Sequence, residues 1–63
     1  MIKKYLKCQP NWYLLELYKQ IKYDLDTGYK QDELKNLINE FSSYNEFQIY
    51  LAIAIEIIDR KLT

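Results

Sequence analysis

The sequence has very few of the residues on which most catalytic and metal sites depend. Its 63 residues include no histidine, one cysteine, one glycine and one proline. The absence of histidine removes the commonest general base and zinc ligand, and a single cysteine excludes a disulfide within the chain. No glycine-rich loop is present to hold a phosphate. We therefore expect a protein that is not an enzyme, with no metal site, no cofactor and no small-molecule substrate.

Long apolar runs are also missing. The most apolar stretch, residues 49–58, is interrupted by Glu56 and is far shorter than the roughly 20 residues that span a bilayer. The basic start, residues 1–7, is not followed by the apolar segment of a signal peptide. These features and the lone cysteine predict a cytoplasmic protein without membrane contact. The bias toward Lys, Ile, Tyr and Asn is typical of a low-GC bacterium, its phage or a plasmid.

The charge is balanced overall but unevenly distributed. Nine basic and nine acidic residues give a formal net charge of zero. Residues 1–10 hold Lys3, Lys4 and Lys7 and no acid, so they carry +3, and the other 6 basic and 9 acidic residues give −3. Such an arm could contact nucleic-acid phosphates through its three lysines, but binding strength grows with the number of phosphates neutralised. A DNA-binding regulator is therefore an alternative interpretation, and nucleic acid is an unlikely partner.

Apolar residues recur at helical spacing in three segments after this arm, about residues 11–27, 30–42 and 44–62. The first segment ends at Gly28, the natural residue for a left-handed helix cap. The second begins with Asp32 and Glu33, whose charges suit the positive end of a helix dipole. The expected buried stripes of these two helices consist of Leu14, Leu17, Tyr18, Ile21 and Leu25 in the first, and Leu34, Leu37, Ile38 and Phe41 in the second.

The third segment is apolar around most of its circumference. Residues 43–46 match a capping box, and this feature and the length favour a helix over a strand, which the alternation in residues 49–57 could also suit. Its expected main stripe consists of Phe47, Tyr50, Leu51, Ala54, Ile57 and Ile58. Ile49 and Ile53 lie beside this stripe, one turn apart, and are predicted to form an outward ridge. Ile55 lies off the other side.

These segments predict one all-α domain over residues 1–63, a small three-helix bundle with a short N-terminal arm over residues 1–10. Two short helices cannot cover all of the third, and a small core adds only a few kcal/mol of stability. Three alternatives for the ridge stay open: the arm covers it through Ile2, Tyr5 and Leu6, a second copy binds it, or another protein does.

Two aromatic residues at the start of the first helix are further contact candidates. Trp12 and Tyr13 project away from the apolar stripe, and such rings are favoured at interfaces. The sequence therefore predicts a small non-catalytic protein–protein interaction module, a regulator or inhibitor, that binds through Ile49, Ile53, Trp12 and Tyr13. The alternatives are the DNA-binding regulator and a structural homodimer.

Overall fold

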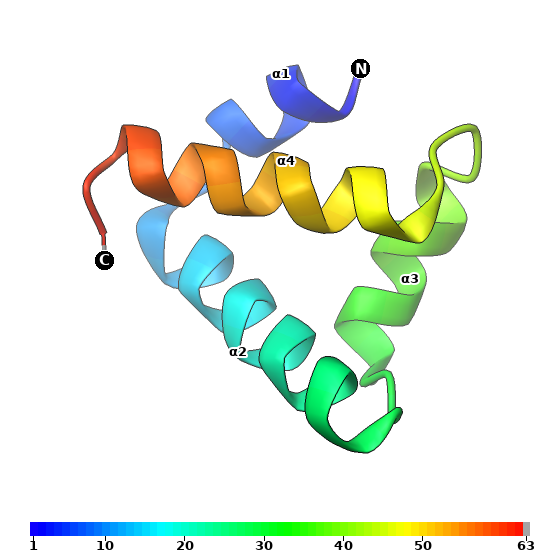
Figure 1. Cartoon of the computed structure of the whole chain (residues 1–63). Coiled ribbons are helices and arrows are strands. Elements are labelled where there is room, and N and C mark those ends of the chain that lie inside the picture. Colours follow the sequence, from blue (N-terminus) through cyan, green and yellow to red (C-terminus); the bar gives the residue numbers. More distant parts are fainter. Residues whose placement is uncertain (63) are drawn as a thin grey trace.

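The computed structural model describes residues 1–62, which form four α-helices and no strand (Figure 1). The all-α class is confirmed, but the arm is itself helical, so there are four helices where three were expected. The helices are α1 (Ile2–Lys7), α2 (Asn11–Thr27), α3 (Asp32–Glu40) and α4 (Glu46–Asp59).

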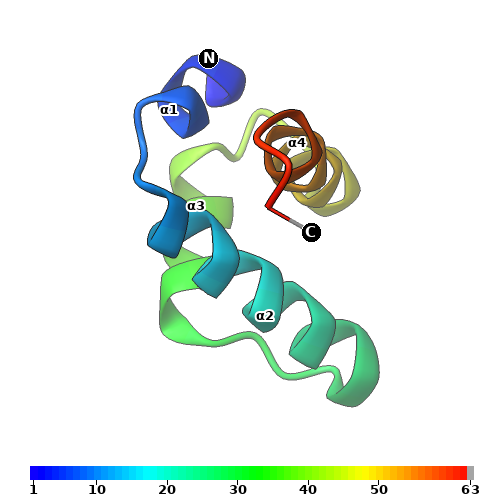
Figure 2. The ribbon, with the colours of Figure 1, turned by 90° about the vertical axis from the view of Figure 1, so that its left-hand side faces the viewer.

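Helix α4 is the element around which the others are arranged. It packs against α1 and α2, and α3 packs against α2. In Figure 2, where α4 is seen nearly end-on, the other three helices lie to its left or below it. No helix lies on its right, which is the side that faces the viewer in Figure 1. One side of α4 is therefore left without a helical neighbour.

The core is a single cluster to which all four helices contribute. The accessible surface of 4451 Å² is close to the roughly 4300 Å² expected for a monomer of this mass, so the chain is as compact as an ordinary protein. The buried apolar residues are Ile2, Leu6, Leu14, Leu17, Ile21, Leu34, Leu37, Ile49, Ala52, Ile53 and Ile57.

The prediction of an outward ridge at Ile49 and Ile53 is wrong, because both side chains are fully buried. The alternative in which the N-terminal arm packs against this helix agrees with the structure, since Ile2 and Leu6 are buried and α1 contacts α4. The predicted main stripe of this helix is wrong at three positions, because Phe47, Leu51 and Ile58 are exposed. Its other members Tyr50 and Ile57 do pack in or against the core. On α2, Leu25 was expected in the core and is exposed as well.

The helix ends follow local rules that the sequence partly revealed. Gly28 ends α2 in the left-handed conformation, with φ 79°, as predicted. The capping box of α4 is formed by Asn45 and Gln48, two residues later than predicted. At the start of α3, the backbone N–H of Leu34 donates to the buried Gln20 Oε1 of α2 at 3.1 Å. A buried side chain from another helix thus satisfies one of the unpaired amides that every helix N-terminus has.

Arg60, just after α4, joins the two ends of the described chain. Its Nε donates to Glu56 Oε2 at 2.9 Å, and Glu56 is almost completely buried. Its other nitrogens reach the C-terminus of α1, where carbonyls have no helical partner and the dipole favours a cation. They donate to the carbonyls of Leu6 and Lys7 at 3.0 Å, to that of Gln9 at 2.7 Å and to Asn11 Oδ1 at 2.9 Å.

A second polar group links α2 to α4. The buried carboxylate of Asp24 accepts a hydrogen bond from the Tyr50 hydroxyl at 2.5 Å, and Lys30 Nζ lies 3.4 Å from it. Lys30 also pairs with Glu46 at 2.7 Å, and the hydrogen bond to Glu46 is the main reason that the pKa of Lys30 is raised. Burial raises the pKa of the Tyr50 hydroxyl well above its ordinary value, and its hydrogen bond to Asp24 raises that pKa further.

The first prediction concerns Arg60. We expect Arg60→Met to lower the free energy of unfolding by about 2 kcal/mol, because it removes charged hydrogen bonds and leaves Glu56 buried without a partner. Urea unfolding followed by circular dichroism measures the change. Lys61→Met, at an exposed neighbouring position, is the control and should unfold at the wild-type midpoint. Equal midpoints for the two variants would show that the bonds of Arg60 do not stabilise the fold.

The second prediction concerns pH. Because the pKa of Tyr50 is higher in the folded chain than the value near 10 of an unfolded one, its contribution to stability is complete below about pH 10 and is lost above it. We therefore expect the wild type to lose more of its free energy of unfolding between pH 9 and 11 than Tyr50→Phe does. Urea titrations across this range test it, with the exposed Tyr29→Phe as control. Parallel curves for wild type and Tyr50→Phe would show that Tyr50 does not titrate in this way.

Candidate functional site

The candidate site is the apolar side of α4 that no helix covers, here called the α4 face. Its side chains are exposed to 73% at Phe47, 48% at Leu51, 40% at Ile55 and 65% at Ile58. The spacing of four, four and three residues places them on one side of the helix. The half-exposed Ala54 belongs to the same side. A helix of a small globular protein normally turns such a stripe toward the core.

The α4 face contains no charge because the charged residue of this stretch points inward. Glu56 is the one charged residue between Phe47 and Ile58, and its carboxylate is buried against Arg60. It comes nine residues after Phe47, which is about half a turn around the helix axis. The one charge of this stretch therefore lies on the inner side of α4 among core isoleucines, and the outer side is left uncharged.

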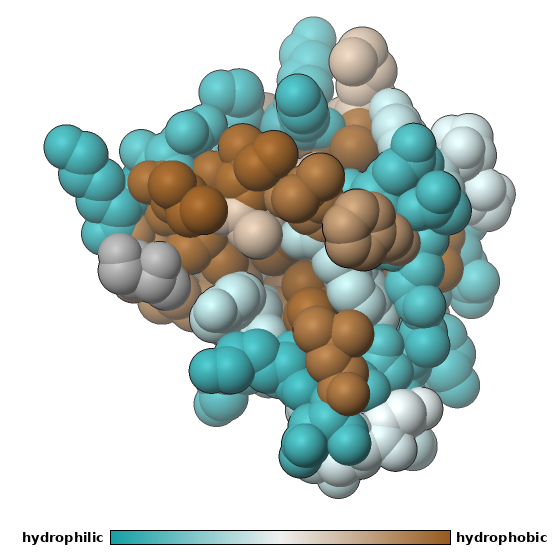
Figure 3. Space-filling view, viewed as in Figure 1, coloured by the Kyte–Doolittle hydropathy of each residue, from teal (hydrophilic) through white to brown (hydrophobic). Residues whose placement is uncertain are grey.

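Figure 3 shows the α4 face as a brown band across the front of the molecule. Brown atoms continue below it onto α2, whose exposed aliphatic side chain is Leu25 at 74%. The side chains of the α4 face expose on the order of 400 Å² of apolar surface, the size of the largest patch on a typical monomer, which is often functional. A typical protein–protein interface buries about 800 Å² on each partner, which is about twice this area and includes a polar rim.

A shallow groove between α1 and α4 extends this surface. Leu51 and Ile55 belong to both the groove and the α4 face, and Lys3 stands at the groove's edge. The remaining lining is mainly apolar, so the groove continues the face toward α1. Its other lining residues are Met1, Ile2, Tyr44, Gln48 and Ala52.

The predicted site residues lie in different places. Ile49 and Ile53 are in the core, where they cannot meet a partner. Trp12 is 66% exposed at the start of α2, and its role as a contact residue stays a prediction. Tyr13 beside it is half-buried, and its hydroxyl lies 3.1 Å from that of Tyr5 in α1, so it joins two helices. The structure therefore does not join these residues into one surface.

The three lysines of the alternative interpretation are together on α1. Lys3, Lys4 and Lys7 are all exposed on this six-residue helix. Their exposure leaves the nucleic-acid interpretation open, and three positive charges neutralise few phosphates.

Sequence reasoning missed the α4 face because it assigned these side chains to the interior. An acidic residue is expected to face water, and placing Glu56 outward turns Phe47, Leu51 and Ile58 inward. The one available signal was Arg60, four residues after Glu56, since an opposite charge at this spacing can satisfy a carboxylate on the same side of a helix. The long-range acceptors that make Arg60 point inward lie about 50 residues away and leave no local pattern.

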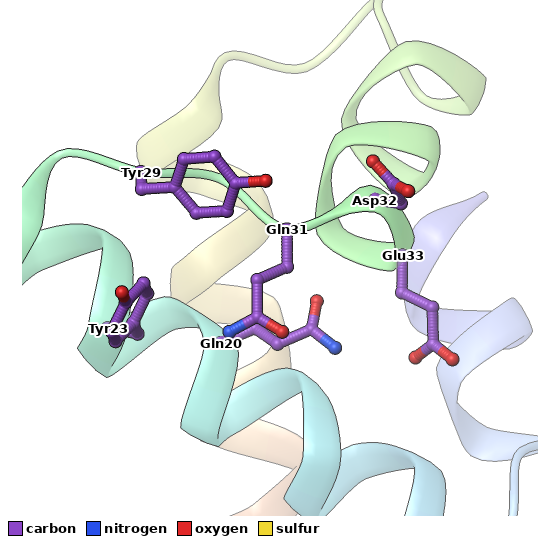
Figure 4. A pocket seen from close by; sticks show the side chains of 6 residues that line it. All are labelled: Gln20, Tyr23, Tyr29, Gln31, Asp32 and Glu33. Carbon is purple, nitrogen blue, oxygen red and sulfur yellow. The ribbon is translucent and has the colours of Figure 1, made fainter.

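A second hollow, at the junction of α2 and α3, is polar (Figure 4). Gln20 and Tyr23 come from α2, and Tyr29 and Gln31 come from the connection before α3. The two carboxylates on its rim, Asp32 and Glu33, point in different directions in Figure 4 and do not form a pair. No group of residues in the described chain has the composition of a metal site. The α4 face is thus the stronger candidate.

No known protein family, curated protein or solved structure matches the chain. Among the helices of residues 1–62, none has the length and apolar character needed to cross a membrane.

The third prediction separates the α4 face from the core. We expect Ile53→Gln to lower the free energy of unfolding by about 4 kcal/mol, because it puts an amide into a fully buried apolar site. Leu51→Gln, two residues earlier, should change it by less than about 0.5 kcal/mol, since its side chain is half exposed. Thermal unfolding followed by circular dichroism compares them. A loss at Leu51 as large as at Ile53 would show that the α4 face is packed inside the protein.

Proposed function

We propose that the protein is a small non-catalytic protein–protein interaction module that binds its partner through the α4 face. The observation that carries this proposal is the continuous, uncharged, exposed apolar side of α4 on a chain whose core is already closed by α1, α2 and α3. Contact between apolar surface and water is unfavourable, and the free energy falls when a partner covers that surface. A role as a regulator or inhibitor agrees with a module that only binds.

The shape of the surface supports recognition of a helix or a shallow apolar groove. A row of side chains along one helix face is a common way in which proteins meet, with anchors spaced by three or four residues. Phe47 and Leu51 are the main anchor candidates, because one is a large and strongly exposed aromatic residue and the other is central. Exposed Trp12 remains a secondary candidate on α2.

Two alternatives use features of the same surface. A homodimer would bury the α4 face of one copy on that of another, and a nucleic-acid regulator would use Lys3, Lys4 and Lys7 of α1. The second has less support, because the rest of the chain is acidic by three charges and repels a polyanion.

The fourth prediction tests the proposal. A variant with Phe47, Leu51 and Ile58 all replaced by glutamine should fold normally but bind the partner at least about tenfold more weakly. Affinity capture from cells that express the protein naturally identifies the partner, and light scattering coupled to size exclusion of the two purified proteins measures the complex. The exposed α3 variant Lys35→Gln is the matched control and should bind like the wild type.

The same preparations separate the alternatives. A partner that binds the triple variant as tightly as the wild type would overturn the proposal. A wild-type protein that elutes as a dimer, with a monomeric triple variant, would assign the face to a second copy. Retention on DNA at low salt that disappears on adding salt would favour the nucleic-acid regulator.

A further inference from the structure

Helix α1 places lysines along one edge of the α4 face. Its buried side is formed by Ile2 and Leu6. On one flank of this side, Tyr5 packs toward Tyr13 and Phe41, with ring centroids 6.4 and 5.3 Å away. The opposite flank carries Lys3, which lines the groove together with Leu51 and Ile55.

Lys7 shares this edge with Lys3, because residues four apart lie on the same side of a helix. Lys3 lines the groove and Lys7 lies one turn further along the same side of α1, so the two form a basic edge of this helix. Here we call Lys3 and Lys7 the lysine rim.

No acidic residue of the described chain pairs with this rim. The ion pairs within residues 1–62 use Lys30 and Arg60 as their cations, and α1 contains no acid. Arg60, whose guanidinium donates to the carbonyl of Lys7, adds no net charge to this edge because it is paired with Glu56. The surface thus combines an uncharged apolar strip with a basic edge that takes part in no ion pair within residues 1–62.

We propose that the partner covers this surface with an amphipathic helix that has acidic residues along one edge. The proposal rests on the proposed function and names its partner. Apolar residues of that helix pack on the α4 face, and its carboxylates pair with the lysine rim. Charge complementarity selects this partner. An apolar strip alone does not distinguish one amphipathic helix from another, whereas a basic edge attracts a helix with acidic residues and repels a helix with basic residues.

The geometry also sets the spacing that the partner needs. Phe47 and Ile58 are eleven residues apart, about 16 Å along the helix, which corresponds to three turns of a partner helix. Its apolar residues should recur every three or four positions over those turns. The lysine rim covers one turn, so two acidic residues four positions apart on one edge would face it.

A second copy of the chain fits this surface less well. The exposed apolar helix that a copy offers is α4. Its Glu46 and Glu56 already pair with Lys30 and Arg60 of the same chain, which leaves Asp59 as its one acid outside those ion pairs. Each copy would also bring its own unpaired lysines to the interface. The partner that the charges favour is therefore a different protein.

The probes for the test are designed peptides of about 18 residues, long enough for the required three turns. Each carries leucines at the stated spacing and two glutamates four positions apart, placed on one edge of the leucine stripe in the first peptide and on the other edge in the second. Two matched peptides carry lysine in place of glutamate. Fluorescence anisotropy of the labelled peptides measures binding.

We expect one glutamate peptide to bind the wild-type protein at least about tenfold more tightly than its lysine counterpart. The double variant Lys3→Glu, Lys7→Glu should reverse this order, and since both positions are exposed it should fold normally. The control Lys19→Glu, Lys35→Glu makes the same charge change at exposed sites on α2 and α3 and should keep the wild-type order. Leu51→Gln should weaken binding of every peptide.

Four results would overturn the inference. They are equal binding of glutamate and lysine peptides, no binding of any peptide, binding to vesicles of phosphatidylcholine and phosphatidylglycerol instead of the peptides, and a homodimer that Leu51→Gln dissociates. If glutamate and lysine peptides bind equally and Leu51→Gln abolishes the binding of both, only the acidic character of the partner is contradicted, and the α4 face remains the docking surface. If Leu51→Gln leaves the binding of the peptides unchanged, the proposed binding role of the α4 face is contradicted as well.

Discussion

The orientation of α4 about its own axis is set by one ion pair, between Glu56 and Arg60. This helix is apolar almost all round, so hydrophobic burial alone gives little preference for either side. Arg60 favours one side, because carbonyls at the end of α1 and in the connection to α2 accept hydrogen bonds from its guanidinium, and Glu56 pairs with the same group. The side of α4 opposite Glu56 is then left facing water.

This arrangement costs folding stability, and a purely structural protein would have no reason to retain it. Burying a carboxylate requires a partner for its charge, and exposing four large apolar side chains forgoes the stability that their burial would add. Natural sequences break such local rules mainly at functional sites. The exposed apolar side chains of α4, together with its buried carboxylate, are therefore the physical features that support the proposed binding role.

The sequence predicts the structure of some elements better than that of others. The stripe of α3 and the end of α2 at Gly28 were predictable, because each depends on residues close together in the chain. The burial of Ile49 and Ile53 and the exposure of Phe47 were not, because they depend on contacts between residues about 50 positions apart. The basic character of the N-terminal segment was visible in the sequence, but its position beside the candidate site was not.

The short length of α1 has a consequence for motion. Six residues cannot maintain a helix by themselves, so α1 holds its shape through Ile2, Leu6 and the bonds from Arg60. Because a helix this short has little stability of its own, the exchange rates of its amide hydrogens report directly on these contacts. Loss of the contacts would remove one wall of the groove and expose the inner side of α4. The shape of the groove at the centre of the chain thus depends on how firmly the first helix is held at its end.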